Sequence, residues 1–263
     1  MASQYIELYN EGSHSCISFD TLVQGAGIQS NQFLIRDGEH ELLIDPGGEL
    51  TFVPLSMAIS RQIKLEELDY IIASHQDPDI IASIGRWMER TRCKVIVSKL
   101  WERFLPHLAS NYLTENMGVK VAERIIPVPD EGAVLPLGES RLKLIPAHFL
   151  HSVGNFQVYD PTSKILFSGD MGASIVEGRA GIAVENFDAH LPHMAGFHAR
   201  YMNSNKACRL WANMIRELDV EMIVPQHGSY FQGKEMVNRF LDWISQLECG
   251  VDLMTQANYR VPN

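Results

Sequence analysis

The side chains best suited to chemistry are histidines and aspartates that directly follow apolar runs of the chain. These residues are His75, Asp77 and Asp79 after YIIAS, His148 or His151 after LKLIPA, Asp170 after KILFSG, and His227 after EMIVPQ. Imidazole and carboxylate groups are ordinary ligands of divalent transition metals. Buried strands that end at one rim of a sheet bring such groups together in a cleft. The pattern therefore predicts a metal site built from four strand ends.

The number and kind of these ligands indicate more than one ion. Two carboxylates stand two residues apart in Asp77-Pro78-Asp79, and their repulsion favours a nearby cation. Three imidazoles and three carboxylates exceed the four ligands of a tetrahedral zinc, which predicts two ions that share a bridging carboxylate. The many oxygen donors favour iron or manganese, and we expect iron because a carboxylate-rich shell stabilises its ferric state. Asp45, in Asp45-Pro46-Gly47, also follows an apolar run, but we assign it a structural role in the turn.

The composition is that of a folded globular protein and excludes several functional classes. The chain has 263 residues, of which 46% are hydrophobic and 21% charged, and we expect one domain over 1–263. The net charge of −10, with no basic block, argues against nucleic acid as a partner. No run reaches about 18 apolar residues and no secretory signal is apparent, so we expect a cytoplasmic protein without membrane insertion. Four widely spaced cysteines fit a reducing compartment.

The elements that must position these ligands alternate between strands and helices. A hairpin is expected over 28–48, with its turn at Asp37-Gly38. Further strands are expected at 68–74, 94–98, 141–147, 154–160, 164–170 and 221–226, and helices at 52–62, 79–91, 99–113 (turned at Pro106), 206–217 and 234–247. The segment 171–194 is predicted to be irregular and long enough for a lid. Together these elements predict an α/β (or α+β) fold with helices outside two packed sheets.

The metal-ligand motifs resemble those of the metallo-β-lactamase fold, in particular of flavodiiron proteins and of free-standing oxygen-binding diiron proteins. Hydrolytic members of that superfamily carry H-x-H-x-D-H, whereas flavodiiron proteins have a carboxylate in place of the second histidine, as Asp77 is here. The segments Leu150-His151, Leu166–Asp170 and Pro225–Gly228 are similar to the other motifs of the family. The resemblance implies a four-layer αββα sandwich.

The resemblance also implies a role for each ligand. One iron would be bound by His75, Asp77 and His151, the other by Asp79 and His227, with Asp170 bridging the two. The implied cofactor is a pair of iron ions, diferrous or diferric, with a bridging oxo or hydroxo group. Ile80 replaces a histidine of the family motif, so the second iron would have an open position for dioxygen.

Four residues are predicted to lie around the oxygen site without binding metal: Ile80, His148, Phe149 and Tyr201. The roles of His190, His193 and His198, which lie near the expected lid, stay open. Because no glycine-rich phosphate loop or flavodoxin-like domain follows His227, no bound FMN is expected.

The resemblance implies a protein that reversibly binds or senses dioxygen, with nitric oxide as an alternative ligand. It further implies a link to bacterial chemotaxis through a chemoreceptor or other signalling protein, and a homodimer. One alternative is an oxygen or nitric oxide reductase with a separate electron-donor protein. Another is a zinc hydrolase, against which Asp77, Ile80 and the negative net charge argue.

Overall fold

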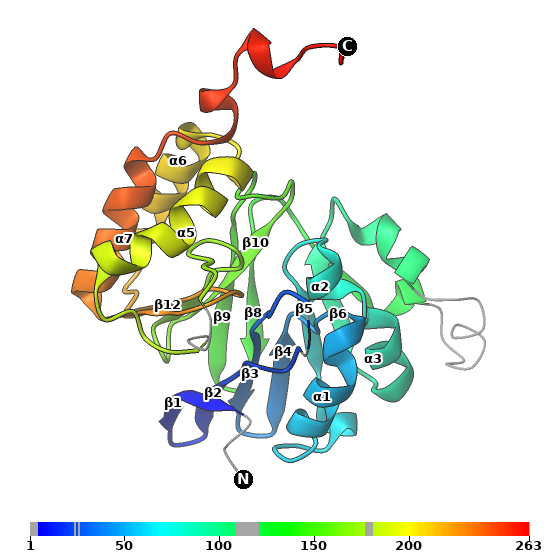
Figure 1. Cartoon of the computed structure of the whole chain (residues 1–263). Coiled ribbons are helices and arrows are strands. Elements are labelled where there is room, and N and C mark those ends of the chain that lie inside the picture. The colour runs from blue at the N-terminus through cyan, green and yellow to red at the C-terminus, as the bar shows by residue number, and fades with distance from the viewer. Residues whose placement is uncertain (1–4, 24, 26, 109–120, 177–180, 263) are drawn as a thin grey trace.

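Two β-sheets face each other, and helices cover the outer face of each sheet (Figure 1). The computed structural model describes residues 5–23, 25, 27–108, 121–176 and 181–262. Helices α1 to α3 lie on one side of the molecule, and α5 to α7 lie on the other. The expected four-layer αββα sandwich is therefore confirmed.

The first sheet has seven strands in sequence order. They are β1 (Ile6–Glu11), β2 (His14–Phe19), β3 (Gln32–Asp37), β4 (His40–Ile44), β5 (Tyr70–Ala73), β6 (Lys94–Ser98) and β7 (Ile125–Val128). Strands β1 to β4 pair antiparallel, and β4 to β7 pair parallel. The predicted hairpin is β3–β4. Its two-residue loop is Gly38-Glu39, one residue later than expected, because Asp37 still pairs with His40.

The second sheet has six strands in the order β13-β12-β11-β10-β9-β8. They are β8 (Ala133–Leu137), β9 (Ser140–Pro146), β10 (Phe156–Asp160), β11 (Ile165–Phe167), β12 (Met222–Val224) and β13 (Phe231–Gln232). All neighbours pair antiparallel except β11 and β12, which pair parallel. The carboxyl ends of β11 and β12 therefore lie at the same rim.

The helices differ from the predicted ones in their bounds and, at 79–91, in an interruption. They are α1 (Glu49–Ile59), α2 (Pro78–Ile81), α3 (Ile84–Arg90), α5 (Phe187–Tyr201), α6 (Asn205–Ile215) and α7 (Lys234–Gln246), with 3-10 turns η1 (Leu65–Glu67), η2 (Glu102–Leu108), η3 (Val121–Arg124), η4 (Gly250–Leu253) and η5 (Gln256–Asn258). Within the expected helix 99–113 the described part is the 3-10 turn η2, and residues 109–113 lie outside the described residues.

Period-two alternation along the strands divides the apolar side chains between the layers. Phe33 and Ile35 of β3 belong to the cluster between the two sheets, whereas Leu34 belongs to the cluster beneath α1 and α3. On the other side, Leu166 of β11 and Phe240 of α7 share the cluster beneath α5 to α7. The sheets are thus apolar on both faces, which requires the two outer helical layers.

Two predicted elements were wrong in part. The expected helix 79–91 is divided into α2 and α3 because the hydroxyl of Ser83 donates to the carbonyls of Pro46 and Gly47, at 2.9 and 2.7 Å. The segment 171–194 is not irregular throughout, since α5 begins at Phe187 behind an Asn186 side chain that accepts from the N–H of Ala189. Strands β1, β2, β7, β8 and β13 were not predicted.

Among the described residues, no helix is long and apolar enough to cross a membrane. The four cysteines are free and buried.

A buried ionic cluster joins the two sheets at His14. Its Nε2 lies 2.7 Å from Oδ2 of Asp160 on β10, and its Nδ1 lies 3.1 Å from Oγ of Ser140 on β9 and 3.7 Å from Oδ1 of Asp37 on β3. Burial opposes the charged imidazole, but the bond to Asp160 and the two carboxylate charges outweigh it and raise the pKa of His14. The ionised cluster therefore holds the sheets together.

Because the pKa of His14 is higher in the folded than in the unfolded chain, its contribution to stability is full below about pH 6.5 and is lost as the pH rises through the folded pKa. We expect His14→Asn to lower the free energy of unfolding by about 3 kcal/mol at pH 6 and by less at alkaline pH, in urea denaturation of chelator-treated protein. The control is His40→Asn, because His40 forms an exposed ion pair with Asp69. This substitution should change the free energy of unfolding by less than about 1 kcal/mol. An equal loss from His14→Asn at both pH values would contradict the interpretation.

Candidate metal centre

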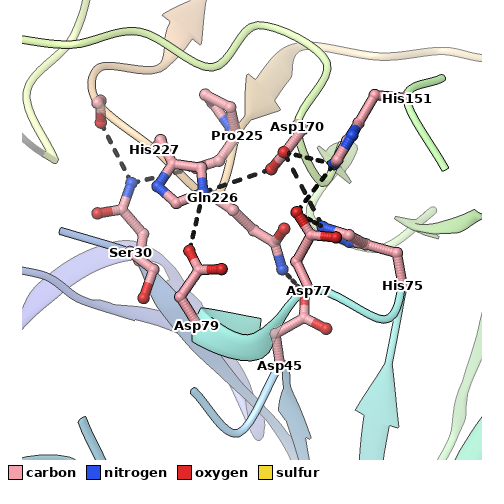
Figure 2. A network of polar contacts seen from close by, with 12 residues as sticks. Ser30, Asp45, His75, Asp77, Asp79, His151, Asp170, Pro225, Gln226 and His227 are labelled. Carbon is pink, nitrogen blue, oxygen red and sulfur yellow. Dashed lines mark hydrogen bonds and ion pairs between the residues drawn. The ribbon is translucent and has the colours of Figure 1, made fainter. Parts of the chain in front are cut away.

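All six predicted ligands lie together at one rim of the sandwich (Figure 2). His75 follows β5, Asp77 and Asp79 flank the start of α2, His151 lies between β9 and β10, Asp170 follows β11, and His227 follows β12. Each ligand thus follows a strand whose buried residues end at the rim. Four connections that are distant in sequence converge on one point.

Four of these side chains form one half of the centre. Nε2 of His151 lies 3.0 Å from Oδ2 of Asp170 and 3.4 Å from Oδ2 of Asp77. Nε2 of His75 lies 3.9 Å from the same two oxygens. One ligand atom from each residue lies within 4.8 Å of all the others. Two imidazole nitrogens and two carboxylate oxygens therefore face a common point, as metal ligands do.

The other half of the centre uses the second oxygen of Asp170. Nε2 of His227 lies 3.5 Å from Oδ1 of Asp170 and 3.5 Å from Oδ2 of Asp79. Asp170 thus presents Oδ2 to His75 and His151 and Oδ1 to His227 (Figure 2). A carboxylate with this placement can bridge two cations.

Several polar atoms of the centre are buried without a hydrogen bond. Within the described part of the chain, Nε2 of His75, Nε2 of His151 and Oδ1 of Asp170 have no hydrogen-bond partner. Buried polar groups normally have one, and an unpaired group is costly. The contacts of His151 are therefore ion pairs without hydrogen-bond geometry. Unpaired atoms of three residues, two imidazole nitrogens and one carboxylate oxygen, lie close together and fit a centre that holds cations.

The carboxylates and imidazoles shift one another's pKa values strongly. Burial alone would lower the pKa of His151, but Asp170 and Asp77 outweigh it and raise that pKa to about 10. Burial alone would raise the pKa of Asp170, but His151, His75 and His227 hold it well below its usual range. For His75 burial dominates and lowers the pKa. Without a metal ion the proton on His151 thus takes the place of a cation.

A buried network behind the centre orients two of the histidines. Asp45 accepts from the N–H and the hydroxyl of Ser74, at 2.9 and 3.1 Å, and from the amide of Gln226. Oγ of Ser74 lies 3.0 Å from Nδ1 of His75, and Nδ1 of His227 donates to the carbonyl of Gln29 at 2.8 Å. These bonds at Nδ1 leave Nε2 of both rings facing the centre. Metal-bound histidines are commonly oriented in the same way, by a hydrogen bond at the other ring nitrogen.

Asp45 does more than hold a turn, the role that the sequence suggested. It is buried in a left-handed conformation, with φ of 58°, and ties the ends of β4, β5 and β12 together. Burial raises its pKa to about 7. Ser74 and Gln226, which were not predicted as site residues, directly precede His75 and His227, and that position was the available signal.

Comparison with known proteins places the chain in a family. A family model described as an ODP family beta lactamase matches residues 28–228. The chain belongs to this ODP family. The chain is 39% identical to the chemotaxis sensor ODP, which is solved as a peroxy diiron species (TM-score 0.84, 98% of this chain and 100% of that one) and, from T. denticola, in an apo state (TM-score 0.83, 97% and 99%).

More distant relatives share the fold. A flavodiiron protein mutant of Thermotoga maritima is 19% identical, with a TM-score of 0.72 over 92% of this chain and 60% of that one. An uncharacterised protein of Methanocaldococcus jannaschii is 26% identical over 220 residues, which make up 82% of this chain and 53% of that protein. This ODP-family chain therefore spans about half the length of the curated relatives it matches. The resemblance to metallo-β-lactamase-fold diiron proteins is confirmed.

The four residues predicted around the oxygen site are spread more widely than the ligands. The ring of Tyr201 lies edge-on to His151, with centroids 5.9 Å apart. Phe149 is 46% exposed at the surface, and Nε2 of His148 bonds the carbonyl of Asp130 at 2.8 Å. Ile80 is fully buried in an apolar cluster with Ala73 and its neighbours. Of the four, Tyr201 lies beside a ligand ring.

The three histidines of α5 differ in their exposure and hydrogen bonds. His193 is exposed, and His190 is buried, with its pKa lowered to about 4 by burial. His198 is fully buried; its Nδ1 donates to the carbonyl of Met194 at 2.8 Å, and its Nε2 accepts from the N–H of Gly172 at 2.9 Å. These bonds define a neutral ring, consistent with a pKa lowered by burial to about 4. His198 thus fixes the turn that follows Asp170.

Metal binding should displace the proton on His151, because a ligand imidazole must be unprotonated. We expect Zn²⁺ added to chelator-treated protein in weak buffer to release protons, and its apparent affinity to fall about tenfold per unit of pH below 7. His151→Gln should release about one proton fewer, whereas His148→Gln, three residues away, should behave like the wild type. Equal proton release by wild type and His151→Gln in calorimetry would contradict this assignment.

Replacement of His198 should loosen the turn after Asp170. His198→Phe leaves the N–H of Gly172 buried and unpaired, and we expect a loss of about 1–3 kcal/mol in the free energy of unfolding and faster release of bound metal to a chelator. His193→Phe, on the exposed face of the same helix, is the matched control. If both variants match the wild type in stability and metal release, His198 does not position the turn.

Proposed function

We propose that this chain is a non-haem diiron protein that reversibly binds dioxygen and reports it to a bacterial chemotaxis pathway. The observation that carries the proposal is the bridging geometry of Asp170, with one oxygen toward each half of the centre. The 39% identity to the chemotaxis sensor ODP, over nearly the whole chain, supports the same function. Dioxygen, with nitric oxide as an alternative, is then the ligand, and a cytoplasmic chemoreceptor is the expected partner.

The ligand residues would divide between two irons. His75, Asp77 and His151 would hold one iron, Asp79 and His227 the other, with Asp170 shared. Iron held there supplies electrons that can be given to dioxygen and recovered. The second half of the centre offers fewer protein ligands, while the exposure of its side chains (14% for His227 and 37% for Asp79) is close to that of His151 and Asp77 (11% and 35%). Dioxygen would therefore bind on the His227 side.

The burial of His75 and Asp170 would limit the access of water and protons to these two side chains, whereas Asp77 and Asp79 are 35% and 37% exposed. Phe197 and Tyr201 stack on each other with ring centroids 4.9 Å apart, and both rings lie steeply inclined to the ring of His151, at 67° and 84°. His75 is buried, with its Nδ1 bonded to Ser74, so it has no direct path to bulk water. Slow proton delivery favours release of the bound gas over its further reduction, which suits a sensor.

The decisive experiment loads chelator-treated protein with Fe²⁺ without oxygen and then adds dioxygen in stoichiometric amount. We expect two irons per chain and a visible absorption band that forms in proportion to added dioxygen and persists. Asp170→Asn should bind fewer than two irons and lose the band, because one of the two carboxylate oxygens is replaced by an amide nitrogen and the negative charge is lost. Asp188→Asn, an exposed carboxylate paired with Arg239, is the control and should match the wild type.

Three results would overturn the proposal. The first is protein that binds zinc but not iron, which indicates a hydrolase. The second is oxygen consumption that continues at more than roughly a few turnovers per second with a reductant, which indicates a reductase. The third is an unchanged iron content in Asp170→Asn.

A further inference from the structure

Two amide side chains close to the centre are fully buried, and each has one end without a hydrogen bond. Asn155 directly precedes β10, and Gln226 directly precedes the ligand His227. Within the described part of the chain, Oδ1 of Asn155 and Oε1 of Gln226 have no hydrogen-bond partner. A buried amide oxygen that gives up its hydration without a replacement is costly. Both oxygens therefore require a donor.

The orientation of both amides is fixed by their nitrogens. Nδ2 of Asn155 donates to the carbonyl of Leu150, and Nε2 of Gln226 donates to the carboxylate of Asp45. Reversing either amide would set its oxygen against the oxygen of its partner, since a carbonyl and a carboxylate can only accept. The two unpaired ends are thus acceptors, and their missing partner is a donor.

Both oxygens border the same point, beside Gly169. A Cβ on Gly169 would lie 3.9 Å from Oδ1 of Asn155 and 3.9 Å from Oε1 of Gln226. Outside the two chain neighbours of Gly169, no other described atom would lie within 4 Å of that Cβ. The carbonyl of Gly169 also accepts from the N–H of Gln226 at 2.9 Å, so the two segments are held together. The missing side chain therefore leaves room between two amide oxygens, one residue before Asp170.

A third buried amide nearby shows that the fold can satisfy such a group by itself. Gln157 of β10 donates through Nε2 to the carbonyl of Ser168 at 2.7 Å and accepts at Oε1 from Nε1 of Trp211 at 2.8 Å. Both of its ends are therefore paired within the chain. The amides of Asn155 and Gln226 differ from it because their oxygens face the room beside Gly169.

We propose that a water molecule is bound beside Gly169 and donates one hydrogen bond to Oδ1 of Asn155 and the other to Oε1 of Gln226. Water is small and neutral, and it carries the two donors that two acceptors require. A calcium ion would need about six to eight oxygen ligands, and two neutral amide oxygens are too few.

The bound water would connect the loops that carry ligands of both halves of the centre. Asn155 holds the carbonyl of Leu150, which precedes His151, and Gln226 precedes His227. Asn155, Gln226 and the water are then positioning groups, which do not touch the metal. The water site is present with or without metal, so it does not rest on the proposed oxygen binding, and the two proposals can fail separately.

A high-resolution crystal structure of the chelator-treated wild type tests the site directly. We expect a single density peak at about 2.8 Å from Oδ1 of Asn155 and from Oε1 of Gln226. If no peak lies within hydrogen-bond distance of both oxygens, the proposal is overturned. This result needs no variant and no metal.

Gly169→Ala tests the site in solution, because its methyl group would take the place of the water. Gly38→Ala is the matched control: Gly38 has φ of 64°, Gly169 has φ of 56°, and a Cβ on Gly38 would have no described atom within 4 Å. Both variants thus carry the same backbone strain. Oxygen-17 magnetic relaxation dispersion should count one long-lived internal water fewer in Gly169→Ala than in Gly38→Ala and the wild type. Equal counts in all three proteins contradict the site.

The positioning role has its own readout, the rate at which Zn²⁺-loaded protein loses metal to a chelator. We expect Gly169→Ala to release metal about tenfold faster than Gly38→Ala, because both ligand loops lose their shared hydrogen-bond donor. Equal rates would show that the water does not hold the ligand loops. Circular dichroism confirms that both variants are folded.

Discussion

The structure depends on the placement of one buried carboxylate, Asp170, between imidazoles on two sides. A carboxylate with 3% of its surface exposed would normally be neutralised by taking up a proton. Here His151 on one side and His227 on the other keep it ionised, and its pKa stays well below the usual range. The same charge that is costly to bury would favour a cation, which can contact the carboxylate oxygens and the facing ring nitrogens together.

The sandwich is suited to this task because its parallel strand pairs end at a common rim. β4 and β5 pair in parallel, as do β11 and β12, so the residues that follow them lie side by side. Asp45 follows β4 and joins the ends of β5 and β12 through Ser74 and Gln226, across the boundary between the two sheets. The ligands thus rest on a buried hydrogen-bonded network rather than on mobile side chains, as a preorganised metal centre requires.

The sequence predicted much of the fold and nearly all of the centre, for a physical reason. Buried strands have strong period-two patterns, and a polar residue that ends such a strand stands out, so His75, Asp170 and His227 were identified from their positions. The choice of His151 over His148 came from the family resemblance, because both follow the same strand. Helix α5 was missed in part, since Pro192, Gly196 and its histidines have weak helix propensity, and its buried face is defined only by packing.

Helix α5 connects the centre with the surface. His198 holds the turn that follows Asp170, while Phe197 and Tyr201 of the same helix contact the ring of His151. Just past its end, the N–H of Asn203 donates to the carbonyl of Phe149 at 3.1 Å, in the loop that carries His151. Helix α5 is therefore in contact with the ring of His151 and with the turn that follows Asp170, and its end is bonded to the loop that carries His151. A change in the position of either ligand must be accommodated by α5 or by the loop, and both form part of the surface that a partner would meet.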